Sequence, residues 1–121
     1  MQSDEQINKN MIIDFNNIPE EEIVGFKGGE GVATTRGFND KDNKIMKMSL
    51  AQGASSGYHK HKGTCETVYI LSGVGHFIYD GQREDVGAGS VHYCPEGHSH
   101  SMHNDGEEPL TYLAIVTTVE R

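Results

Sequence analysis

The sequence has no tryptophan, only three prolines and two cysteines, and no long hydrophobic run. None of its apolar stretches approaches the roughly 20 residues that a membrane-spanning helix requires. The two cysteines, Cys65 and Cys94, lie far apart in the chain, and we expect reduced thiols that pack as small apolar side chains. The sequence therefore predicts no membrane partner and no disulfide framework.

Basic residues are also scarce. Ten Lys and Arg stand against 18 Asp and Glu, which gives a formal net charge of −8. This excess of negative charge argues against nucleic acid and against an anionic membrane as partners. The first residues, Met1 to Asp4, are polar and acidic, unlike a secretory signal, so we expect a cytoplasmic location.

No stretch of useful length has helical periodicity. Alternating and β-branched segments separated by glycine-rich turns predict an all-β protein, either a sandwich or a closed barrel. The expected strands are 31–38, 44–51, 66–72, 76–79 with its hairpin partner after Asp80-Gly81, 90–94, 99–104 and 110–119. Residues 1–13 are expected to be a mobile segment, and 17–22 to form either a short helical turn or a loop.

Histidine, by contrast, is abundant, and all seven histidines lie between positions 59 and 103. On an extended strand His59 and His61 point to one face. Glu66 follows five residues later, and Gly63 lets the chain bend so that the carboxylate returns to that face. His100 then supplies a third imidazole. Imidazoles and one carboxylate in this pattern suit an open site for a divalent transition metal.

These residues belong to two longer spacing patterns. The first runs Gly, five residues, His-x-His, four residues, Glu, six residues and Gly, and is filled by Gly53, His59, His61, Glu66 and Gly73. The second runs Gly, five residues, Pro-x-Gly, two residues, His, three residues and Asn, and is filled by Gly89, Pro95, Gly97, His100 and Asn104. With both motifs complete over 53–104, the chain resembles the cupin superfamily.

This resemblance implies one small cupin domain over residues 1–121, folded as a double-stranded β-helix or jelly-roll barrel. It also implies one divalent metal ion held by His59, His61, Glu66 and His100. Cupins usually use iron or manganese, and the same ligands suit nickel or zinc. Four protein ligands leave one or two positions of an octahedral ion open to water, substrate or O₂. Since the imidazoles must be neutral to bind, metal affinity should fall in acid.

The walls of the expected pocket follow from strand parity and from proximity to the motifs. The candidates are Tyr58, Met48, Val68, Ile70, Met102 and, at the rim, His98. His103 is out of phase with His100 and should face away from the metal, while His76 and His92 have no assignable role. The motif half of the chain contains one arginine, Arg83, beyond a turn, so a dianionic substrate held by a bidentate guanidinium is less expected. Arg36 is the one candidate for a carboxylate clamp.

The resemblance favours a metal-dependent enzyme acting on a small organic molecule. The expected reaction is a dioxygenation, or a decarboxylase, lyase or isomerase step on an oxygenated acid or sugar derivative. The alternative is a small-molecule binding or sensor cupin with a structural metal, and a weaker one is an accessory subunit. The sequence identifies no catalytic side chain, no substrate and no role for the two cysteines.

Two further expectations concern assembly and charge. The long apolar strand 110–119 is expected either in the centre of a sheet or at a subunit contact. It offers more surface than a small barrel buries alone, which predicts a homodimer through an exposed edge. In the metal-free protein, Glu66 lies among apolar neighbours, and burial is expected to raise its pKa.

Overall fold

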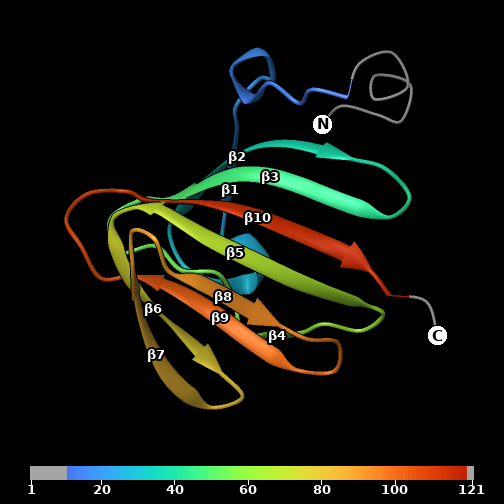
Figure 1. Ribbon diagram of the computed structural model, residues 1–121. Coiled ribbons are helices and arrows are strands. Elements are labelled where there is room, and N and C mark those ends of the chain that lie inside the picture. The colour runs from blue at the N-terminus through green and yellow to red at the C-terminus, as the bar shows by residue number, and fades with distance from the viewer. Residues whose placement is uncertain (1–10, 120–121) are drawn as a thin grey trace.

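The computed structural model describes residues 11–119, and Figure 1 shows two antiparallel β-sheets that face each other. A mobile segment was expected over residues 1–13. Residues 1–10 of it lie outside the described residues. No helix in the described range is long and apolar enough to cross a membrane.

The larger sheet has six strands. In spatial order they are β1 (Glu21–Val24), β2 (Val32–Asn39), β3 (Asn43–Leu50), β10 (Leu110–Thr118), β5 (Thr64–Ser72) and β8 (Val91–Cys94). The smaller sheet contains β4 (His59–Lys60), β9 (Ser99–Asn104), β6 (Val74–Tyr79) and β7 (Gln82–Gly87). Two short 3₁₀ helices, η1 (Phe15–Asn17) and η2 (Phe26–Gly28), complete the fold. The predicted all-β jelly roll is confirmed.

Local sequence determines the tightest hairpin. Asp80 and Gly81 join β6 to β7, and both have positive φ, 46° and 82°, as a two-residue turn between twisted strands requires. The segment 17–22 differs from expectation. The 3₁₀ turn ends before Pro19, and the acidic run continues into β1, which pairs with β2 from Glu21↔Thr35 to Val24↔Val32. Pairing with a sheet edge here outweighs the local preference for a turn.

The core lies between the two sheets and follows the period-two pattern of the strands. On β5, Val68 and Ile70 are completely buried, while Tyr69 and Leu71 on the opposite face are 41% and 42% exposed. Glu66 shares the parity of the buried pair, so the same alternation that builds the core directs this carboxylate inward. From the smaller sheet, Phe77 closes the core.

The expected central position of the strand 110–119 is confirmed, and the alternative of an exposed apolar edge is wrong. β10 lies in the middle of the larger sheet, paired along its length with β3 on one side and β5 on the other. Its apolar side chains therefore serve the core of this chain. Exposed apolar side chains gather instead on the outer face of β5 and β8, at Tyr69, Leu71, Val91 and Tyr93.

The homodimer remains a prediction, now placed on that outer face of β5 and β8. Light scattering should give a dimer mass over a wide concentration range, and Val91→Lys should shift the equilibrium toward monomer because a charge enters the apolar contact. Val24→Lys, at an exposed valine on β1, is the control. A monomer mass at all concentrations would refute the dimer.

Candidate metal centre

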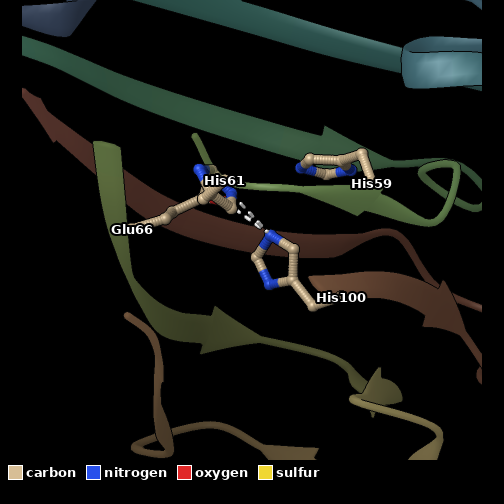
Figure 2. A group of neighbouring side chains, drawn as sticks. All are labelled: His59, His61, Glu66 and His100. Carbon is tan, nitrogen blue, oxygen red and sulfur yellow. Dashed lines mark hydrogen bonds and ion pairs between the residues drawn. The ribbon is translucent and has the colours of Figure 1, made fainter. Parts of the chain in front are cut away.

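Both sheets contribute to one cluster of side chains. His59 on β4 and His100 on β9 are direct cross-strand partners in the smaller sheet. His61 follows β4, and Glu66 reaches in from β5 of the larger sheet. Figure 2 shows these side chains converging from separate segments, so an ion held here would tie the two sheets together.

The loop that carries His61 is fixed by the turn before β9. The backbone N–H of His61 donates to the carbonyl of His98 at 3.0 Å, and the N–H of Gly97 donates to the carbonyl of His61 at 2.7 Å. The N–H of Gly63 donates to the Glu96 carboxylate at 3.0 Å. The Pro-x-Gly turn of the second motif thus positions a ligand of the first motif.

The ligand atoms are spaced as a divalent ion requires. Nε2 of His61 lies 3.0 Å from Nε2 of His100, and Oε1 of Glu66 lies 3.2 Å and 2.9 Å from these two nitrogens. Adjacent ligands of an octahedral ion with bonds of roughly 2.1 Å are about 3.0 Å apart. The four residues, with His59, offer ligand atoms all within 4.8 Å of one another.

The outer nitrogen of each ring has its own hydrogen-bond partner. Nδ1 of His59 donates to the carbonyl of Gly57 at 2.7 Å, which leaves Nε2 with its lone pair directed to the cluster. Nδ1 of His61 lies 2.9 Å from the hydroxyl of Thr64, and Nδ1 of His100 lies 3.0 Å from Nε2 of His92. Imidazoles oriented in this way by outer partners are typical of metal ligands, so the residues fit a divalent ion.

The expected rise in the pKa of Glu66 is wrong. Burial does act to raise this pKa, but contacts with the imidazoles of His100 and His61 outweigh it and lower the pKa to about 2. The cause is that Glu66 faces two rings rather than the apolar side chains that follow it on β5. Burial lowers the pKa of His59. An ionised carboxylate and a neutral imidazole are the forms that bind metal.

A cavity of about 600 Å³ opens beside the cluster. Of the six expected wall residues, Met48, Val68 and Met102 line it, together with Phe77 and Tyr112. The other three lie outside its lining.

The reasons for those three exceptions are visible in the packing. Ile70 is completely buried in the core, and Tyr58 is 54% exposed on the outside. His98 is held in the β6–β7 turn region by the carboxylate of Asp80 and the hydroxyl of Tyr79.

Arg36 is not a substrate clamp in this structure. Its guanidinium donates to the carbonyls of Ile18 and Phe15 and pairs with Glu20, so it anchors the segment before β1. Lysines contribute the positive charge of the cavity instead. Five of the seven lysines line it, all with exposed side chains at its mouth: Lys27, Lys41, Lys44, Lys60 and Lys62.

The roles of His92 and Glu84 were not predicted from the sequence. His92 lies on β8 with the inward parity of Cys94, and it connects His100 to the carboxylate of Glu84 on β7. Burial, and then the nearby His100, lower the pKa of His92. The alternation along Val91–Cys94 is a signal for an inward-facing histidine, but not for its partner. His103 faces away from the cluster, where it stacks on His76 with 4.5 Å between ring centroids.

Comparison with known proteins agrees with this fold. The family model for the cupin domain matches residues 46–116. This range includes both motifs and all four residues of the candidate metal cluster. The chain belongs to the cupin family. Two of the matches come from Thermotoga maritima.

A curated protein from this bacterium, named oxalate-binding protein, is 33% identical over 112 residues, covering 88% of this chain and 93% of the relative. A crystal structure from the same bacterium, described as a predicted oxalate decarboxylase, is 32% identical with a TM-score of 0.85, and covers 90% of this chain and all of that one. An RmlC-like cupin from Shewanella frigidimarina shares the fold alone, with 15% identity, a TM-score of 0.75 and coverage of 91% and 92%.

We predict that His61→Ala removes most of the bound metal, because a central, 7% exposed ligand is lost from the chelate. Elemental analysis of protein purified without chelator measures this. His103→Ala is the matched control, since His103 lies off the cluster and bonds to Ser101. Metal content in His61→Ala equal to that of the control would exclude His61 as a ligand.

We also predict that metal stabilises the fold, because an ion at the cluster binds only where both sheets are in place. At a hundredfold excess over Kd the gain is about 2.7 kcal/mol, so chelation should lower Tm by several degrees. Glu66→Gln should reduce this difference, because it removes the charged ligand. The melting curves are to be compared with and without chelator on samples of verified metal content. An unchanged curve for the wild type would place the metal outside the cluster.

Proposed function

We propose that this cupin binds a small dicarboxylate at a divalent metal ion, with oxalate as the first candidate, and acts on it in a decarboxylase or dioxygenase reaction. The observation that carries this proposal is the position of the four-residue cluster in a cavity whose mouth is lined by five lysines. The names of the two Thermotoga relatives support the same ligand class.

Charge favours an anionic ligand in this cavity although the whole chain is acidic. A divalent ion with three neutral imidazoles and one carboxylate has a net charge of +1, and the lysines add to it. Apart from Glu66, the cavity is lined by two acidic residues, Glu21 and Asp40, against five lysines. A dianion therefore meets a local potential opposite to the net charge of −8.

The remaining walls suit a ligand of low molecular weight. Met46, Met48, Val68 and Phe77 give an apolar surface that excludes water around the polar centre. Tyr112 is 2% exposed, and its hydroxyl donates only a weak contact to the sulfur of Met48 at 3.7 Å. Burial raises the pKa of Tyr112, so the phenol stays protonated and is suited to donate to a ligand oxygen.

The proposed ion is iron or manganese, in line with the family, and it supplies Lewis-acid and redox chemistry when bound. The lysines and Tyr112 would orient the ligand beside the ion. The apolar walls would keep water away from it.

One observation favours a second candidate, a protein that binds the same ligand without turnover. Every histidine that lines the cavity belongs to the candidate metal cluster, and so does Glu66. The other carboxylates of the lining are Glu21 and Asp40. Few groups are thus placed to move a proton during catalysis. Formate, CO₂ and O₂ uptake measured on metal-loaded protein with oxalate separate the two candidates. Binding without product identifies the second.

Lysine at the mouth gives a matched test of the ligand class. Lys44 and Lys47 lie on the same strand, β3, but Lys44 lines the cavity and Lys47 does not. We predict that Lys44→Met weakens oxalate binding by about 1.5- to 5-fold, the effect of one exposed ionic contact, while Lys47→Met leaves it unchanged. Calorimetry on metal-loaded protein measures this, with malonate and a neutral sugar as comparison ligands. Equal affinity of both variants and wild type, or preference for the sugar, would reject a dicarboxylate ligand.

A further inference from the structure

A line of three side chains connects the candidate metal centre to the outer surface of the protein. Oε1 of Glu84 lies 3.1 Å from Nδ1 of His92, and Nε2 of His92 lies 3.0 Å from Nδ1 of His100. Glu84 comes from β7, His92 from β8 and His100 from β9, so the line crosses from one sheet to the other and back. Both distances are those of normal hydrogen bonds.

The middle of this line is rigid and dry. The His92 side chain is 3% exposed, and its ring stacks on Phe77 with 3.8 Å between centroids and an interplanar angle of 18°. Its ring also stacks on that of His100 at 5.2 Å. Glu84 at the far end is 46% exposed and is not part of the cavity lining. Changes at Glu84 therefore leave the walls that face a ligand untouched.

The direction of both hydrogen bonds follows from the chemistry of the first one. A carboxylate can only accept, so Nδ1 of His92 must carry a proton. The Nε2 of a neutral His92 can then only accept, and Nδ1 of His100 must donate to it. His100 thereby carries a proton on Nδ1, so Nε2, which faces Glu66 and His61, is the nitrogen left to bind an ion.

We propose that Glu84 and His92 are positioning residues that fix the tautomer and orientation of His100 and thereby set the affinity of the cluster for a divalent ion. The effect on affinity rests on metal binding at the cluster, as in the proposed function. The effect on the tautomer does not, because the hydrogen bonds exist in the chain itself. A carboxylate behind an imidazole makes the imidazole a stronger metal ligand, and here the carboxylate acts through an intervening ring.

The test compares Glu84→Gln with Asp85→Asn. Both changes remove one negative charge from neighbouring positions of β7, but Asp85 pairs with Arg83 at the surface and does not contact His92. We expect Glu84→Gln to weaken Zn²⁺ binding about 10-fold, in the range found for partners behind metal ligands, and Asp85→Asn to leave it within about 2-fold. Competition with a chromogenic chelator measures both affinities, and equal affinities in the two variants would overturn the link to metal binding.

A second readout uses the metal-free protein. Nitrogen-15 NMR of the histidine rings should show His100 protonated at Nδ1 in the wild type and in Asp85→Asn, and a mixture of tautomers in Glu84→Gln. A wild-type His100 without a proton on Nδ1 would overturn the proposal even if zinc binds. Conversely, a wild-type protein with the expected tautomer but no zinc affinity would reject the metal centre and the proposed function, and would leave the positioning of His100 in place.

Discussion

The structure depends on the contact among three ring nitrogens and one carboxylate oxygen inside a barrel. With its outer nitrogen acting as a donor, the inner nitrogen of His100 lies 3.0 Å from Nε2 of His61 and 2.9 Å from Oε1 of Glu66. Acceptor atoms this close repel in a poorly solvated site unless a proton or a metal cation lies between them. A divalent ion removes this repulsion, and it does so only when the two sheets have closed. Cation binding and the packing of the sheets are therefore one thermodynamic event.

Strand parity explains why so small a chain can hold such a site. One alternation along β5 places Val68 and Ile70 in the core and Glu66 in the cluster, so no separate structural device is needed for the ligand. The turn that ends at Gly97, where φ is 88°, then returns hydrogen bonds to His61 and aligns the two motifs. Each motif supplies candidate ligands, and the backbone of the second motif positions a candidate ligand of the first, His61.

The sequence was informative wherever a feature is local. The hairpin at Asp80 and most of the strands follow from spacings of a few residues, and the grouping of the motif residues follows from the resemblance to the cupins. Asn104 shows the limit of motif reasoning: its amide donates to the carbonyls of Leu50, Ala51 and Glu108, so it supports loops rather than the ion. The anchoring role of Arg36 and the contact of Glu84 with His92 depend on pairings between distant segments. A single sequence does not encode these in any short pattern.

The candidate metal centre has two sides, a cavity side and an outer side, and the surrounding side chains differ between them. On the cavity side, exposed lysines surround an apolar well, which favours the entry of a small anion. On the opposite side, His92 separates His100 from Glu84 and from water, so that the outer carboxylate influences the ligand without admitting solvent. The negative charge of Glu84 behind His100 would strengthen the binding of a cation at the cluster. The positive lysines on the cavity side would strengthen the binding of an anion to that cation.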